Sequence, residues 1–239
     1  MSSSRTVIII DPRVEWYRSQ FVGKYPGLEV KVFADSHAAE AHVADAEAIL
    51  AMGHHFHDSL VAKAGKLKWI QAFTTGVDQI VLLPSLRPEV LVTSMRGIHG
   101  TQLSEMAFMH MLSLSRNMRE ILRNQDRAAW VRLPQPRLAG KTVVIVGVGL
   151  IAAALAPRCK AFEMKVIGVT SAPRDLPGFD AMMRREELVQ AAALADFMVV
   201  LAPYTPENDK LVSKQVIDVM KPTSILVNIA RGEIGRAHV

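Results

Sequence analysis

Short apolar runs alternate with amphipathic stretches over residues 6–94. The runs are of strand length, and the stretches between them carry apolar residues at helical spacing. This alternation predicts a small parallel sheet with helices between its strands. The predicted strands are Thr6–Ile10, Leu28–Phe33, Ala48–Met52, Leu67–Ala72 and Val90–Ser94. The predicted helices are Val14–Tyr25, Asp35–Ala44 and Asp58–Ala64.

The pattern changes near residue 100. Residues 101–130 contain neither glycine nor proline and keep apolar residues at helical spacing, which predicts one long helix. Pro134 and Pro136 then break it. We place the domain boundary near Gly100, before this helix, with one domain at 1–100 and a second at 101–232.

Residues 138–170 follow the order strand, Gly-rich turn, helix, strand. Val143–Val146 is an unbroken apolar run, as expected of a parallel strand buried on both faces. In the next turn, Gly147 permits a tight bend, Gly149 lets the backbone approach a pyrophosphate, and Ala152 allows close packing of the helix. A glycine pair alone often marks only a turn. Its place between a strand and a helix favours dinucleotide binding.

The remainder of the second half continues the alternation. Its elements are predicted at Lys165–Val169 (strand), Arg184–Ala195 (helix), Phe197–Leu201 (strand), Val212–Met220 (helix) and Ser224–Asn228 (the fourth strand). The segment 202–208 follows the carboxyl end of a strand, which is where open α/β sheets bind ligands.

Composition restricts the class of protein. Half of the 239 residues are apolar, but no apolar run approaches the ~18 residues of a membrane span. Only Cys159 is available for a disulfide, and the first residues lack a signal-peptide pattern, so we expect a cytoplasmic protein. The net charge of +5 is spread along the chain without a basic block, which argues against a nucleic-acid partner.

Two loops in the first half carry polar candidates. His54, His55 and His57 could suggest a metal, but without a cysteine or carboxylate at suitable spacing an ordinary polar loop is the better interpretation, and we predict no metal site. The segment 74–78 reads Thr-Thr-Gly-Val-Asp. It is either an ordinary turn whose Asp78 caps a helix or a loop whose N–H groups hold an anionic carboxylate.

Several motifs together resemble one family. LAGKTVVIVGVGLIAAALA, AFEMKVIGV, LAPYTPENDKLV and MKPTSILVNIARGE occur in the order and spacing of the D-isomer-specific 2-hydroxyacid dehydrogenases. Upstream, TTGVD and GIHGTQLSE resemble that family's substrate-domain segments. The resemblance covers roughly residues 45–232, and the chain is identified as a member of the family.

The resemblance implies a fold and an activity. The fold would be α/β, with a flavodoxin-like substrate half followed by a doubly wound Rossmann-type sheet. The activity would be NAD(P)-dependent interconversion of a D-2-hydroxy acid and its 2-oxo acid, of the glyoxylate or hydroxypyruvate type. The family also commonly dimerises through the helix that corresponds to 101–130. A nucleotide-sensing regulator, such as the family's corepressors, is the alternative.

The resemblance also assigns site residues. The backbone of Thr75, Gly76 and Val77 would hold the substrate carboxylate. Arg231, at the tip of a buried strand, would bind the carboxylate bidentately and polarise the carbonyl group. The residues predicted to contact the cofactor are Gly147, Gly149, Leu150, Ile151, Thr170, Ser171, Arg174, Ala202, Pro203, Thr205, Ile229 and Ala230.

Cofactor choice depends on the end of the second nucleotide-domain strand. NAD-selective sites place an acid there, whereas this chain has Thr170 and Ser171, with Arg174 close by. Both hydroxyl groups and the guanidinium group suit a 2′-phosphate. A loop with an unrelated arginine is the alternative, so the sequence favours NADP over NAD only slightly.

Two residues depart from the family pattern. Pro157 falls inside the helix after the glycines, where proline normally costs ~3 kcal/mol or kinks the helix. Glu163 stands where the family generally has glycine at the helix end. We expect these departures to lower stability before they affect binding.

The C-terminal residues raise a further expectation. The family's Glu and His for proton transfer lie beyond the position of Gly232, and His238 is too close to Arg231 to replace that histidine. Residues 233–239 read like a translated sequencing adapter, so we expect a non-native tail. The chain would then be a fragment without the acid/base pair and without normal turnover.

Overall fold

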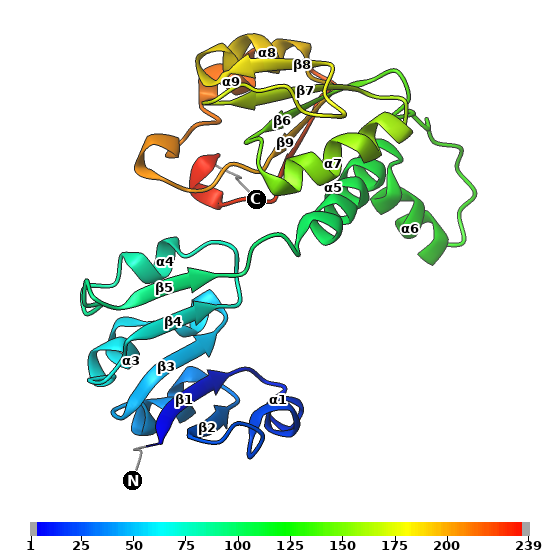
Figure 1. Cartoon of the computed structure of the whole chain (residues 1–239). Coiled ribbons are helices and arrows are strands. Elements are labelled where there is room, and N and C mark those ends of the chain that lie inside the picture. The colour runs from blue at the N-terminus through cyan, green and yellow to red at the C-terminus, as the bar shows by residue number, and fades with distance from the viewer. Residues whose placement is uncertain (1–3, 236–239) are drawn as a thin grey trace. The chain divides into compact units, whose positions relative to one another are not determined.

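The computed structural model describes residues 4–235 and divides the chain into two compact units. The first unit ends at Arg96 and the second begins at Gly97 (Figure 1). Each unit is a five-stranded sheet whose strands are all parallel, with helices in the connections. The predicted α/β class is therefore confirmed.

The first unit has the strand order β2-β1-β3-β4-β5, which is the flavodoxin-like order. Its strands are β1 (Arg5–Ile10), β2 (Leu28–Phe33), β3 (Ala46–Ala51), β4 (Trp69–Ala72) and β5 (Leu91–Ser94). Its helices are α1 (Val14–Phe21), α2 (Ser36–Ala39), α3 (Asp58–Lys63) and α4 (Asp78–Val81).

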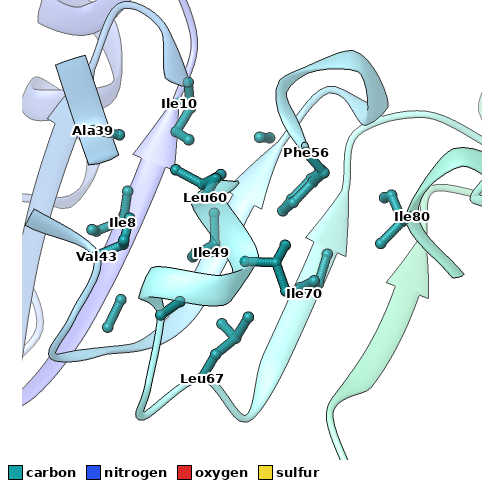
Figure 2. Close-up of a cluster of buried hydrophobic side chains, with 14 of the residues drawn as sticks. Ile8, Ile10, Ala39, Val43, Ile49, Phe56, Leu60, Leu67, Ile70 and Ile80 are labelled. Atoms are coloured by element: carbon teal, nitrogen blue, oxygen red, sulfur yellow. The ribbon is translucent and has the colours of Figure 1, made fainter. Parts of the chain in front are cut away.

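Apolar side chains from neighbouring strands form the core of this unit. Figure 2 shows Ile8, Ile49 and Ile70, from β1, β3 and β4, gathered beside Leu60 of α3. All four are fully buried, and burying a side chain of this size contributes roughly 1.5–3 kcal/mol. The core fixes the sheet, so the loops after its strands leave from a rigid edge.

Two helices of the first unit are shorter than predicted. Helix α1 ends at Phe21 instead of Tyr25, because Val22 is extended with ψ 127° and the following Gly23 adopts φ +74°. The segment predicted as a helix from Asp35 divides into α2 and a 3₁₀ turn at Glu40–His42. At its start the Asp35 carboxylate accepts a 2.8 Å hydrogen bond from the Ala38 N–H.

The second unit has the strand order β10-β9-β6-β7-β8, a Rossmann-type arrangement. Its strands are β6 (Thr142–Val146), β7 (Lys165–Thr170), β8 (Ala181–Arg184), β9 (Phe197–Val200) and β10 (Ile225–Asn228). Its helices are α5 (Gly100–Ser115), α6 (Met118–Asp126), α7 (Leu150–Ala161), α8 (Leu188–Leu194) and α9 (Lys214–Asp218).

Both faces of this sheet are covered. Val143 and Ile145 of β6 share one core cluster with residues of α5 and α7, which pack side by side (Figure 1). Val144 and Val146 belong to another cluster with residues of α8 and α9. The alternation along β6 therefore explains its unbroken apolar run: every second residue faces a different helical layer.

The predicted helix at 101–130 is two helices. It breaks at Asn117, which adopts a left-handed conformation with φ 54° between α5 and α6. Asparagine tolerates this region better than most residues because its short polar side chain can hydrogen-bond locally. Its amide donates to the Pro134 carbonyl oxygen at 3.1 Å.

Strand β8 was not predicted from the sequence. Ala181–Arg184 pairs with β7 in the register Ile167↔Ala181 to Thr170↔Arg184, so the predicted helix start at Arg184 is wrong. Helix α8 begins at Leu188, after a 3₁₀ turn at Arg185–Glu187. With β8 included, β10 is the fifth strand of its sheet instead of the fourth.

Both departures in α7 are visible in the structure. The helix runs through Pro157, and Glu163 adopts φ 59° just beyond the helix end. The N–H groups of Glu163 and Met164 donate to the carbonyl oxygens of Lys160 and Cys159, at 2.9 and 3.1 Å. This is the Schellman pattern, in which glycine is the usual residue at the position of Glu163.

The end of the described chain is packed against the second unit. Ile234 is fully buried, and its carbonyl oxygen accepts a 2.8 Å hydrogen bond from the Val212 N–H. The remainder of the expected tail, including His238, lies outside the described residues. Within residues 4–235 we find no helix with the length and hydrophobicity needed to cross a bilayer.

Candidate active site

The Gly-rich turn after β6 is shaped for a ligand. Gly147 adopts φ +96°, and a β-carbon there would lie 2.4 Å from the Ala202 nitrogen, so only glycine fits. A β-carbon on Gly149, by contrast, would meet no atom within 4 Å. Gly149 directly precedes α7, whose first N–H groups form the positive end of the helix dipole. The turn can therefore receive an anion against bare backbone.

A cavity of about 470 Å³ opens over this turn, at the carboxyl ends of β6, β7 and β9. Parallel strands bring these ends to one edge of the sheet, the usual ligand edge of such folds. The lining residues are Val146, Gly147, Val148, Gly149, Val169, Thr170, Ser171, Arg185, Leu188, Leu201, Ala202, Pro203, Thr205, Glu207, Asn208 and Leu211.

The structure brings most of the predicted cofactor residues to this cavity. Those that line it are Gly147, Gly149, Thr170, Ser171, Ala202, Pro203 and Thr205. Leu150 and Ile151 form the first turn of α7, next to Gly149. Ile229 and Ala230 follow β10 and are outside the lining.

Arg174 lies at the Gly-rich turn. Its guanidinium group donates a 3.2 Å hydrogen bond to the Val148 carbonyl oxygen, yet Arg174 is not among the residues that line the cavity. The loop that carries it packs tightly on α7, since a β-carbon on Gly178 would lie 2.9 Å from the Pro157 nitrogen.

Among the lining residues that were not predicted to contact the cofactor, three are polar or charged: Arg185, Glu207 and Asn208. The Arg185 guanidinium group donates to the Glu207 carbonyl oxygen, and the Asn208 amide donates to the Pro203 carbonyl oxygen at 2.8 Å. The pKa of Glu207 is lowered, first by a hydrogen bond from Thr205. The Arg-Arg pair at 184–185 would have been a signal for Arg185 had β8 been recognised.

Arg231 follows β10, at the same carboxyl edge of the sheet. Its guanidinium group contacts the Ala230 carbonyl oxygen at 3.0 Å, and the residue is half-buried. Because β6, β9 and β10 are parallel neighbours, the Gly-rich turn and Arg231 lie at one edge of one sheet. A cation at this edge suits an anionic substrate.

The predicted carboxylate loop follows β4 in the first unit. Within residues 4–235, the N–H groups of Thr75, Gly76 and Val77 donate to no protein acceptor. The Thr74 hydroxyl group fixes the turn by donating to the Gly76 carbonyl oxygen at 2.8 Å. Val77, not Asp78, occupies the N-cap of α4, so the predicted cap is wrong. The loop nevertheless presents backbone donors suited to an anion.

The histidine-rich loop has a structural role at one residue. His57 is the N-cap of α3, where its Nδ1 accepts from the Leu60 N–H at 3.3 Å and contacts the Ser59 hydroxyl oxygen at 2.9 Å. Burial lowers the pKa of His55. In the part of the chain that the structure describes, no group of three or more His, Cys, Asp or Glu residues is arranged to hold a metal ion.

Comparison with known families gives two matches. Residues 108–237 match the D-isomer specific 2-hydroxyacid dehydrogenase NAD binding domain, and residues 7–135 match the catalytic domain of the same family. A glyoxylate reductase from Thermococcus onnurineus is 29% identical over 224 residues, which cover 86% of this chain and 66% of the relative. Two further curated relatives are covered over 34% and 55% of their length, so the chain spans about half of such proteins.

Solved structures agree with these matches. A D-isomer specific 2-hydroxyacid dehydrogenase family protein from Aeromonas salmonicida superposes with a TM-score of 0.88 at 31% identity, covering 98% of this chain and 76% of that one. An NADPH-dependent glyoxylate/hydroxypyruvate reductase from Sinorhizobium meliloti, solved with NADP and sulfate, gives 0.80 at 25% identity, with 97% and 74% covered.

Proposed function

The chain belongs to the D-isomer-specific 2-hydroxyacid dehydrogenase family. We propose that it forms part of an NAD(P)-dependent oxidoreductase that interconverts a D-2-hydroxy acid and its 2-oxo acid. One observation carries the proposal. The open Gly149 turn, its cavity and Arg231 lie at one edge of the second sheet. A dinucleotide and a carboxylate substrate need this combination of groups.

The residues of this chain fit a nicotinamide nucleotide. The space beside Gly149 and the first N–H groups of α7 would hold the pyrophosphate, and the lining at Thr170 and Ser171 would hold the adenosine ribose. The bound nucleotide supplies or accepts a hydride. The contribution of the protein is to orient the bound nucleotide and to exclude competing reactions.

Arg231, in the second unit, would act on the acid. A guanidinium group can bind a carboxylate bidentately and polarise the neighbouring carbonyl group while keeping its own proton. From the family resemblance, we propose separately that the backbone N–H groups of Thr75, Gly76 and Val77, in the first unit, bind an anionic carboxylate. Proton transfer requires the family's His and Glu, whose positions in the resemblance follow Gly232.

We therefore propose that the 239-residue chain alone binds nucleotide but does not turn over substrate. General acid/base groups typically supply about 10²–10⁴-fold in rate. The substrate class is a small 2-oxo acid, and the relatives from Thermococcus onnurineus and Sinorhizobium meliloti favour glyoxylate or hydroxypyruvate.

A titration followed by a rate assay tests this proposal. The chain is titrated with NADPH and NADH by cofactor fluorescence, and then mixed with glyoxylate or hydroxypyruvate while absorbance is followed. We expect saturable binding without turnover, and Gly149→Ala serves as the matched variant, which should bind NADPH at least about 10-fold more weakly. Absence of nucleotide binding would refute the dehydrogenase proposal, and rates on the order of 1–10³ per second would refute inactivity of the chain alone.

We further propose that the complete protein is a homodimer that uses α5 and α6. Met109, Leu114 and Leu122 expose 54, 55 and 52% of their surface, and Trp130 exposes 92%. An exposed apolar surface of this kind favours a twofold interface, as in the family. Sedimentation of the complete protein should give a dimer, and Leu122→Glu should give a monomer. A monomeric wild type would contradict the proposal.

A further inference from the structure

Arg185 is the cation that the structure places on the cavity wall. It directly follows β8, whose last residue Arg184 pairs in register with Thr170 of β7. Ser171 and Arg185 directly follow the paired residues Thr170 and Arg184, so they lie at the same edge of the sheet. Thr170, Ser171 and Arg185 all line the cavity. Two hydroxyl groups and a guanidinium group thus line one cavity, at the sheet edge where a NAD-selective enzyme normally carries an acid.

Neighbouring groups fix the position of Arg185. The Glu187 carboxylate accepts a 2.6 Å hydrogen bond from the Arg184 N–H and closes a capping box around the short 3₁₀ turn. The guanidinium group donates to the backbone carbonyl oxygen of Glu207, which also lines the cavity. This hydrogen-bond partner is a neutral carbonyl group. The Glu207 carboxyl group lines the same cavity, and its pKa is lowered by a hydrogen bond from Thr205 and also by the positive charge of Arg185, so a bound phosphate would share Arg185 with this carboxylate. A guanidinium group has five N–H donors, and one carbonyl oxygen leaves several for another acceptor.

Arg174 occupies a different position. Its guanidinium group is hydrogen-bonded at the Gly-rich turn, to the Val148 carbonyl oxygen, and it is outside the cavity lining. The two arginines therefore lie on different elements: Arg174 is in the loop after β7, and Arg185 directly follows β8.

We propose that Arg185, together with Thr170 and Ser171, binds the 2′-phosphate of NADP(H) and is the main residue that selects this cofactor. The inference rests on the proposed function, since it concerns the same nucleotide site. A 2′-phosphate carries up to two negative charges and several acceptor oxygens, which suit a guanidinium group flanked by hydroxyl donors. The 2′-hydroxyl group of NADH carries no such charge, so Arg185 would contribute little to the affinity for NADH.

The test compares Arg185→Ala with Arg184→Ala in the 239-residue chain. Arg184 is the adjacent arginine, is exposed and does not line the cavity, so it controls for loss of one positive charge at this edge. Binding of NADPH, NADH, 2′,5′-ADP and 5′-AMP is measured by fluorescence or calorimetry. Circular dichroism checks the fold of each variant, and Arg185→Lys tests whether a charge alone is sufficient.

We expect Arg185→Ala to weaken NADPH and 2′,5′-ADP about 10- to 100-fold, as for loss of hydrogen bonds to a charged group, and NADH and 5′-AMP less than about 3-fold. Arg184→Ala and Arg174→Ala should change NADPH affinity less. Equal loss of all four ligands would overturn the inference, because it would place Arg185 on the shared adenosine. A wild type that prefers NADH would also overturn it but leave the dehydrogenase proposal standing, whereas a wild type that binds neither nucleotide refutes both.

Discussion

The side-chain amide of Asn228 brackets the backbone of Arg231 at the end of β10. Its Nδ2 donates to the Arg231 carbonyl oxygen at 2.8 Å, and its Oδ1 accepts from the Ala230 N–H at 3.0 Å. One side chain thus satisfies a donor and an acceptor of the turn that carries the arginine. These two hydrogen bonds support the turn that carries Arg231, beyond the end of β10 at Asn228.

Asn228→Ala should therefore destabilise the protein. Both hydrogen bonds are partly buried, and each contributes about 1 kcal/mol net, so we expect a loss of roughly 1–2 kcal/mol in the free energy of unfolding. Asn208→Ala is the matched control, since its amide makes a single exposed hydrogen bond to Pro203. Urea unfolding of the two variants measures the difference. An equal loss in both would show that the Asn228 bracket has no special role.

Glu163→Gly should stabilise the protein. Glu163 holds φ 59°, a conformation that costs a residue with a β-carbon about 1–2 kcal/mol and costs glycine little. After subtraction of glycine's greater unfolded-state entropy, we expect a gain of about 0.5–1 kcal/mol. Glu163→Ala removes the carboxylate but keeps the β-carbon, so it should give no such gain. Thermal unfolding distinguishes charge from backbone conformation, and equal effects of the two substitutions would contradict this explanation.

Much of the second sheet could be predicted because the pattern of apolar residues within each short segment indicates which residues are buried. Val143–Val146 lies between two helical layers, so every residue is apolar, and packing against Ala202 excludes any residue but glycine at the following Gly147. These constraints act over a few neighbouring residues. A pattern of apolar residues and glycines is sufficient to indicate them.

Other features depend on contacts that are distant in sequence. Strand β8 has exposed and half-buried side chains, and it forms because β7 offers its edge at Thr170 and the three residues before it. The break at Asn117 is supported by Pro134, seventeen residues later. Arg185 could be assigned to the cavity only once β8 was placed. The part of the site on that strand was therefore beyond local reasoning.

Asp180 should make stability depend on pH. The Lys160 ammonium group, 2.8 Å away, and the Val166 N–H, at 2.7 Å, lower the pKa of its carboxyl group below the ordinary 3.8. Since the folded-state pKa is lowered, the stabilisation is present above pH 3.8 and is lost as pH falls through the lowered pKa. Asp180→Asn should therefore be less stable than wild type at pH 7, and the difference should shrink toward pH 3.

Asp175→Asn provides the control for Asp180. It removes the same charge from the same connection between β7 and β8, at an exposed position. Unfolding free energies of the three proteins at pH 7, 5 and 3 measure the effect. A wild-type advantage over Asp180→Asn that persists unchanged at pH 3 would contradict the assignment to the Asp180 carboxylate.

Alanine at the two glycines of the turn after β6 should give opposite phenotypes. At Gly147 the new β-carbon would lie 2.4 Å from the Ala202 nitrogen, at φ +96°, so the clash and strain together should cost on the order of 3 kcal/mol. At Gly149 the β-carbon meets no atom within 4 Å, so stability should change by less than about 0.5 kcal/mol.

Gly149 is the position at which the backbone must approach a pyrophosphate, and a methyl group there occupies the ligand's space. Gly149→Ala should thus fold normally and bind NADPH at least about 10-fold more weakly, since loss of charge-assisted contacts to a phosphate is of that order. Denaturant unfolding and fluorescence titration give the two readouts, and normal NADPH affinity in a folded Gly149→Ala variant would remove the pyrophosphate from this turn.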